Sequence, residues 1–167
     1  MSPWSHPTTI PPGPMTRDLA PRPGVTLVEG GADVAVYAGH ADAVELCLFD
    51  AGDKAGTSER RIPLLERAHG WWFAFVPGIT AGQRYNFRAH GAWSPDQGLR
   101  HNPAKLLLDP YAKAIEGKVR WGAEVYGHVV DVRWHGDGEL ISELDSRGHM
   151  PLGVVVDDRF DWEGDVP

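Results

Sequence analysis

Short apolar runs, several with strict alternation of apolar and polar positions, fill the chain between residues 25 and 91. Alternation with a period of two is typical of half-buried β-strands, whereas a helix repeats every three to four residues. Clusters of Gly, Asp and Pro separate the runs and predict turns. The expected strands are residues 25–29, 34–37, 43–49, 61–64, 71–76 and 83–90. Strands of this length and spacing predict an all-β chain, folded as an antiparallel β-sandwich.

The fifth expected strand is apolar on both faces. Alternation places Trp71, Phe73 and Phe75 on one face, and Trp72 and Val76 on the other. Because neither face is polar, we expect other parts of the chain to cover both of them.

The sixth expected strand, residues 83–90, has one apolar and one polar face. Its odd positions, which include Tyr85 and Phe87, face the core, whereas Asn86 and Arg88 lie on the other side. We therefore expect a half-buried strand whose outer face presents hydrogen-bond donors to whatever lies outside the sheet.

The strand pattern stops after residue 91. Asn102 can cap a helix and Pro103 suits its first turn. Residues 105–108 would then fill one or two turns, and the pair Asp109-Pro110 would end them. The sequence predicts a short helix here.

Composition divides the chain into three parts. Half of the fourteen prolines lie in the first 23 residues, and proline removes a backbone donor that a regular sheet needs. Residues 1–24 are therefore predicted to be a flexible leader, and residues 25–116 to form the sandwich. Residues 117–167 would form an irregular extension, with a turn at 136–139 and a brief strand at 154–156.

Length and charge narrow the classes of function. A chain of 167 residues can bury one core. Its net charge of −7 disfavours nucleic acid and anionic membranes as partners. The single cysteine, Cys47, lies in an apolar run, so we expect a buried thiol and no disulfide within the chain. We find no signal peptide and no membrane-spanning run, and we expect a cytoplasmic location.

Motifs that could carry a reaction are missing. His128, Asp131 and His135 match no common metal-binding spacing, so we interpret them as surface residues. There is no nucleophile elbow and no phosphate-binding glycine loop. The carboxylates near the C-terminus are typical of a solvated surface. We therefore predict no catalytic residues, no metal and no cofactor.

A run near the middle of the chain carries a resemblance to a known family. Residues 98–115 read GLRHNPAKLLLDPYAKAI, and AVELCLFD stands earlier at 43–50. Together with a Pro-Gly pair at 77–78 and the block at 145–157, they occur in the order found in bacterial glycogen-debranching enzymes of the isoamylase type, in the α-amylase superfamily. The chain resembles the N-terminal domain of those enzymes.

The resemblance implies an immunoglobulin-like sandwich of the family-48 carbohydrate-binding module type. In that family a (β/α)₈ barrel follows and carries the catalytic residues, but such a barrel needs about 250 residues. We expect an accessory domain that positions α-glucan (glycogen or a malto-oligosaccharide) beside this barrel, its partner, which would hydrolyse α-1,6 branches. The alternatives are a structural module that binds no sugar and a free-standing glycogen-binding protein.

The resemblance also suggests a sugar site. Trp93 falls at the position of a tryptophan that such modules use, and Asn86 stands near the position of their lysine. Arg88, on the same outer face, would be a further donor. The lysine itself is missing, as is a second tryptophan, because Phe49 is followed by Asp50-Ala51-Gly52. The alternative for Trp93 is packing against a neighbouring loop or domain.

The run at 102–115 has two interpretations. It either docks onto the barrel or closes the core of the sandwich. We expect a mixture, with leucines directed inward and with Asn102, Lys105 and Tyr111 directed toward the partner domain.

Overall fold

The computed structural model describes residues 22–53, 55–131, 133 and 135–158. The leader predicted at 1–24 lies almost wholly outside these residues. The described chain is built of β-strands joined by turns, with single-turn 3₁₀ helices at η1 (Pro95–Gln97) and η2 (Ala123–Val125). The predicted antiparallel β-sandwich is confirmed, while the immunoglobulin-like strand order stays a prediction. Within the described ranges, no helix is long and apolar enough to span a membrane.

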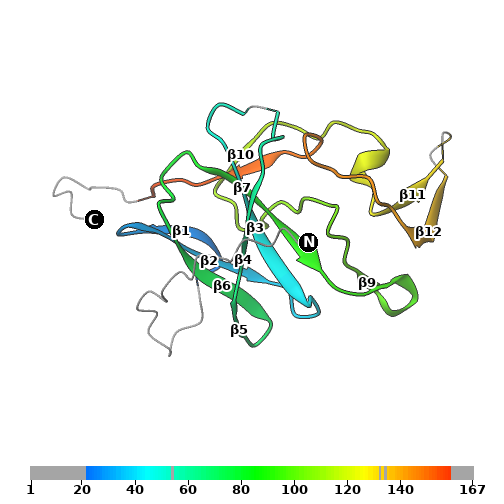
Figure 1. Cartoon of the computed structure of the whole chain (residues 1–167), viewed down its shortest axis with the longest axis horizontal. Coiled ribbons are helices and arrows are strands. Elements are labelled where there is room, and N and C mark those ends of the chain that lie inside the picture. The colour runs from blue at the N-terminus through cyan, green and yellow to red at the C-terminus, as the bar shows by residue number, and fades with distance from the viewer. Residues whose placement is uncertain (1–21, 54, 132, 134, 159–167) are drawn as a thin grey trace, which may run out of the picture.

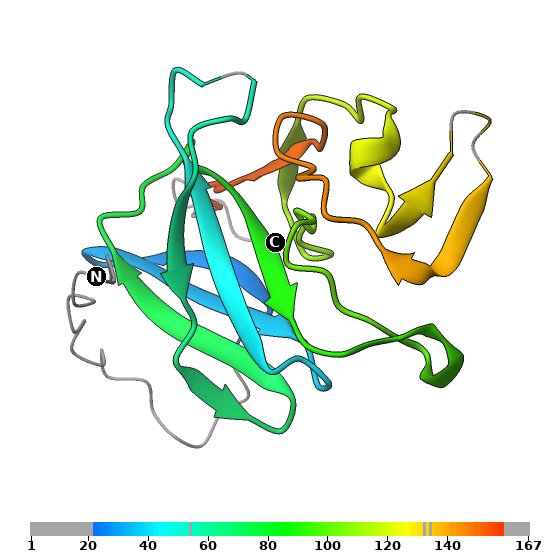
Figure 2. The same cartoon turned by 45° about the vertical axis from the view of Figure 1, so that its right-hand side comes forward.

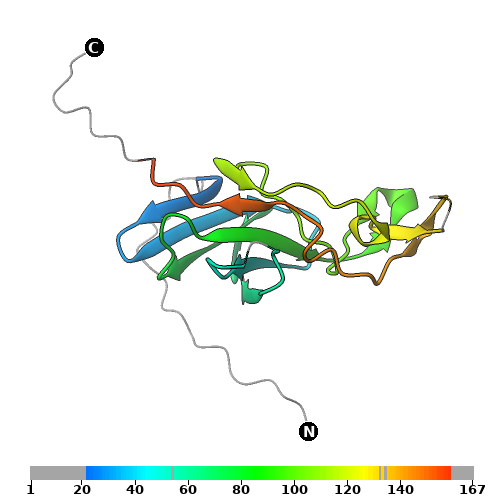
Figure 3. The ribbon, with the colours of Figure 1, turned by 90° about the horizontal axis from the view of Figure 1, so that it is seen from above.

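Two sheets form the layers of the sandwich (Figures 1 and 3). The first has the order β1 (Gly24–Val28), β2 (Gly31–Tyr37), β6 (Trp71–Pro77) and β5 (Glu66–Ala68). The second has the order β10 (Ala114–Glu116), β13 (Leu152–Val154), β7 (Arg84–His90), β3 (Ala43–Phe49) and β4 (Arg60–Pro63). Neighbouring strands in both sheets are antiparallel. All six strands expected from the alternation are therefore present.

The core lies between the two sheets. Val34 and Trp72 enter it from the first sheet, and Val44, Leu46 and Phe87 from the second. These side chains come from the alternating positions that the sequence pattern assigns to one face, because successive residues of a strand point to opposite sides. Burial of their apolar surface is the main stabilising contribution of the sandwich.

The outer face of β6 differs from the expectation. Trp72 and Val76 are buried in the core, but Trp71, Phe73 and Phe75 are only half-buried. Within the described residues, the outer face of this strand is therefore covered only in part, which confirms the expectation for the core face alone. An apolar pattern shows which residues favour burial, but not whether the fold supplies a covering layer.

The helix predicted after Asn102 is absent. Leu107 instead pairs with Phe87 of β7, with N···O distances of 2.9 and 2.8 Å between their backbones. Strand β13 pairs with β7 only at Tyr85 and Arg84, so the next backbone groups of β7 need another partner. Asn102 still turns the chain, because its side-chain oxygen accepts a hydrogen bond of 2.9 Å from the amide of Ala104.

The extension is more regular than expected. Strands β11 (His128–Val130) and β12 (Gly136–Ile141) form a hairpin, so the turn predicted at 136–139 is part of a strand. The brief strand expected at 154–156 is present as β13, shifted toward the N-terminus and placed inside the second sheet. The small hairpin of β8 (Trp93–Ser94) and β9 (Leu99–Arg100) precedes the extension. Figure 2 shows β11 and β12 to one side of the sandwich.

The core predicts a contrast between two leucines. Leu46 is fully buried, whereas Leu65 is 79% exposed. Leu46→Ala should lower the free energy of unfolding by about 2–5 kcal/mol, because it removes buried methyl groups and leaves a cavity. Leu65→Ala should change it by less than about 0.5 kcal/mol. Urea titration followed by circular dichroism measures both, and equal effects would contradict this assignment of the core.

Candidate functional site

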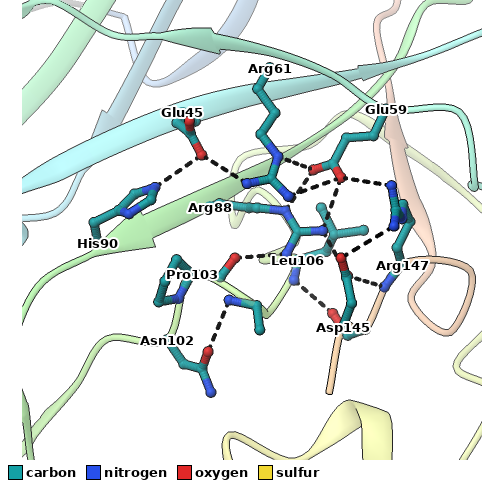
Figure 4. A network of polar contacts seen from close by, with 12 residues as sticks. Glu45, Glu59, Arg61, Arg88, His90, Asn102, Pro103, Leu106, Asp145 and Arg147 are labelled. Carbon is teal, nitrogen blue, oxygen red and sulfur yellow. Dashed lines mark hydrogen bonds and ion pairs between the residues drawn. The ribbon is translucent and has the colours of Figure 1, made fainter. Parts of the chain in front are cut away.

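A buried arginine lies at the centre of the polar network over β7 (Figure 4). The side chain of Arg88 is 0% exposed, and its Nε and Nη2 atoms donate to the two carboxylate oxygens of Glu59 at 2.6 and 3.1 Å. Nη2 also donates to Asp145 at 2.8 Å, and Nη1 to the carbonyl of Pro103 at 2.8 Å. One guanidinium therefore joins β7 to three segments that are distant in the sequence.

Glu59 is the main counterion of this arginine. Its side chain is 1% exposed and also pairs with Arg61 at 3.1 Å. Burial alone would raise the pKa of Glu59, but hydrogen bonds from Arg88 and Cys47 bring it below the ordinary value. The thiol of Cys47 is buried, as predicted, and burial raises its pKa far above the normal range. This cysteine is therefore an unreactive part of the core.

The outer face of β7 is not open to a ligand. Asn86 is 0% exposed; its side chain donates to the carbonyl of Pro151 at 2.9 Å and accepts from the amide of Gly153 at 3.3 Å. Arg88 is equally buried. The expectation of an exposed donor face is therefore wrong, because residues 102–109 and 142–151 fold back over β7. The polar side chains of this face bind the chain itself, as buried polar groups must.

Two residues predicted to dock a partner domain bind the extension instead. Asn102 donates to the carbonyls of Gly127 and Ser142, at 2.9 and 2.8 Å. The ammonium of Lys105 donates to the carbonyls of Glu124 and Leu144 at 2.8 and 2.5 Å, and its distance to the Ser142 hydroxyl is 3.3 Å. Both residues are only 6% exposed, and burial lowers the pKa of Lys105. We call this group of contacts the clamp.

The leucines were expected to point inward and Tyr111 outward, and the structure shows this only in part. Leu106 is buried, whereas the side chain of Leu107 is 45% exposed and its backbone pairs with β7. Tyr111 is 50% exposed, as expected for a residue directed outward. Its backbone amide donates to Asp109 at 2.8 Å, which fixes the turn that carries its ring.

Trp93 packs against the extension. Its indole N–H donates to the carbonyl of Glu139 in β12 at 3.0 Å. A Cβ atom placed on Gly127 would lie 3.3 Å from the indole ring, so this glycine lets the ring and the backbone approach closely. The side chain is half-buried. The packing interpretation of Trp93 is therefore the one that the structure shows, and sugar stacking on this ring stays a prediction.

The described residues hold no group of three or more His, Cys, Asp or Glu side chains that could bind a metal ion. His135 and Asp131 form a pair at 3.4 Å, in which both side chains are at least half exposed. The Asp131 side chain accepts hydrogen bonds from the backbone amides of Arg133 and His135 in its own loop. This arrangement fits a surface turn.

The comparisons with known proteins fit this architecture. A family model described as carbohydrate-binding module 48, the isoamylase N-terminal domain, matches residues 23–112. The chain belongs to this family. The module covers β1 through Tyr111, and the clamp joins it to the extension.

Similarity to named relatives extends beyond the module. A glycogen debranching enzyme of Cronobacter sakazakii is 41% identical over 145 residues, which are 87% of this chain and 20% of that protein. One of Serratia proteamaculans is 40% identical over 92% of this chain and 21% of its own. The chain thus spans about a fifth of the length of these relatives. Since 145 aligned residues exceed the module, the similarity also includes residues outside it.

A solved structure supports the shared fold. The catalytic module of the multi-modular glycogen-degrading pneumococcal virulence factor SpuA is 21% identical, with a TM-score of 0.51. The alignment covers 83% of this chain and 17% of that one.

The clamp predicts that Lys105 holds the extension onto the module. Lys105→Met keeps most of the stem but removes the ammonium, so its three acceptors lose their donor and the unfolding free energy should fall by about 1–3 kcal/mol. Hydrogen exchange measured by mass spectrometry should become faster in peptides from residues 123–145. Lys118→Met, at an exposed position, is the matched control. Equal exchange in the two variants would contradict a clamp.

The arginine network predicts a dependence on pH. Burial raises the pKa of Asp145, but hydrogen bonds from Arg88 and the Arg147 amide bring it below the ordinary value. The stability that it contributes is then present above about pH 4 and lost as the pH falls further. Asp145→Asn should lower the unfolding free energy at pH 7 by roughly 1 kcal/mol, because a third of the side chain meets water, and reduce the decline below pH 4.

Asp96→Asn is the control for this change, at an exposed position in η1. Urea titrations between pH 7 and pH 2.5 compare the two variants with the unchanged chain. An acid decline that Asp145→Asn leaves as steep as before would contradict the role of this carboxylate.

Proposed function

We propose that this chain is a non-catalytic region of a glycogen-debranching enzyme, where it positions α-glucan beside the domain that cleaves α-1,6 branches. The observation that carries this proposal is the identity of about 40% with glycogen debranching enzymes over residues that include the extension. A module borrowed by an unrelated protein would keep similarity only within the sandwich. Here the module and the extension are joined by buried hydrogen bonds of the clamp.

The non-catalytic role is supported by the state of the buried carboxylates. Retaining glycosidases need two carboxyl groups about 5 Å apart on either side of the scissile bond. Glu59 is closed off from solvent by its pair with Arg88. Asp109 is 2% exposed and accepts a hydrogen bond of 2.7 Å from the Tyr85 hydroxyl. Both groups are engaged in holding the fold together.

A structural role without sugar binding is the second candidate. One specific observation favours it: the side chains at the predicted sugar-binding positions form hydrogen bonds within the chain. The indole N–H of Trp93 binds Glu139, and the amide of Asn86 binds Pro151. Under this alternative the chain would support a neighbouring domain only.

The location of the protein is proposed from its cysteine content. A single buried thiol, Cys47, is typical of proteins that fold in a reducing compartment. We therefore propose a cytoplasmic location, where glycogen as the substrate would also be found.

Glycogen affinity electrophoresis distinguishes the two candidates. If the chain positions α-glucan, a native gel that contains glycogen should retard it relative to albumin, while a gel without glycogen should not. The same chain should bind maltoheptaose in calorimetry with a dissociation constant below about 1 mM, which corresponds to roughly −4 kcal/mol. Unchanged mobility together with no heat at millimolar sugar would favour the structural role.

A further inference from the structure

Aromatic side chains form a row on the outer face of the four-stranded sheet. Trp71 stands opposite Tyr37 in the register of β6 and β2, and both point away from the core because the adjacent Trp72 points into it. Tyr111, from the turn before β10, lies beside Trp71. Tyr37 is 59% exposed and Tyr111 is 50% exposed. We call the surface formed by these three rings the aromatic face.

The three rings are neighbours but not coplanar. The ring centroids of Tyr37 and Trp71 are 5.6 Å apart with an interplanar angle of 72°. Those of Trp71 and Tyr111 are 6.4 Å apart at 42°. Half-buried Phe73 and Phe75 continue the apolar surface along β6. The result is a curved aromatic surface rather than a flat one.

Polar groups surround this apolar surface. Within the described part of the chain, no hydrogen-bond partner is found for the hydroxyls of Tyr37 and Tyr111 or for the indole N–H of Trp71. Two carboxylates share the face, since Asp33 stands opposite Phe75 and Glu66 opposite Phe73. The face therefore offers donors and acceptors around aromatic planes, and Arg22 lies close enough to Asp33 to interact with that carboxylate.

This chemistry selects the class of ligand. A glucose ring has apolar C–H faces, which stack on aromatic planes, and hydroxyls at its edges, which both donate and accept. Carboxylates on the face can accept hydrogen bonds from sugar hydroxyls. Rings tilted by 72° and 42° fit a chain that bends, as α-1,4-glucan does, better than the flat ribbon of β-1,4-glucan.

We propose that the aromatic face of Tyr37, Trp71 and Tyr111 binds a segment of an α-1,4-linked glucan chain. The inference rests on the proposed function, but it places the sugar on the sheet opposite to Trp93 and Asn86. Those two residues are engaged with the extension, whereas on the aromatic face Tyr37 and Tyr111 are at least half exposed and Trp71 is half-buried. The module would thus present glucan on its first sheet while its second sheet holds the extension.

Calorimetry with maltoheptaose tests the location of the site. Trp71→Ala should weaken binding at least about tenfold, because the central ring of the row is lost. Tyr37→Ser and Tyr111→Ser, at exposed positions that the fold tolerates more easily, should each weaken it by about threefold or more. Trp121→Ala removes a tryptophan that is 75% exposed in the extension, and it should change binding less than twofold. Cellopentaose should bind more weakly than maltoheptaose.

Other outcomes would overturn the proposal in distinguishable ways. Maltoheptaose binding that all three aromatic-face variants leave unchanged would place the sugar elsewhere and leave the proposed function standing. No binding by the unchanged chain would overturn both. A dimer that is seen in sedimentation velocity and lost in Trp71→Ala would indicate that the aromatic face binds a second copy of the chain and not a sugar. A shortened chain that begins at Arg22 and binds maltoheptaose ten times more tightly would indicate that residues 1–21 occupy the aromatic face in the unchanged chain.

Discussion

The pairing of Arg88 with Glu59 is the interaction on which the second half of the structure depends. Two fully buried charges are stable only when their hydrogen bonds are satisfied, because an unpaired buried charge costs several kcal/mol. Glu59 alone does not satisfy the guanidinium, which also binds Pro103 and Asp145. Folding of the sandwich therefore requires that the segments carrying these partners are in place. The clamp of Asn102 and Lys105 continues the same connection into the hairpin.

The two sheets consequently have different roles. The second sheet is covered by residues 102–109 and 142–151, and its polar side chains Asn86 and Arg88 form hydrogen bonds to these segments. On the first sheet Tyr37 is 59% exposed, and Tyr111, from the turn before β10, lies beside Trp71 and is 50% exposed. This division explains why Asn86 and Trp93, the residues predicted to bind sugar, are engaged internally, while Tyr37 on the first sheet is exposed.

The strands were predictable from sequence because alternation is a local property. The position of β4 at a sheet edge also follows from one residue, Pro63, which lacks a backbone donor. Burial of Asn86 was not predictable, since a polar position looks the same whether water or another segment lies above it. The helix expected after Asn102 does not form, because the backbone of Leu107 instead pairs with the backbone of Phe87 in β7. No pattern around Glu59, which lies in the loop before β4, marks it as the counterion of Arg88 in β7.

The place of β13 in the second sheet has a consequence for synthesis. This strand lies between β10 and β7, although it is the last of the described strands to be made. Until residues 152–154 have left the ribosome, β10 has no neighbour to pair with and the start of β7 has an open edge. The first sheet can pair β1, β2, β5 and β6 once residue 77 has emerged. The second sheet therefore closes after the first, and a nascent chain stopped before β13 exposes an unpaired sheet edge.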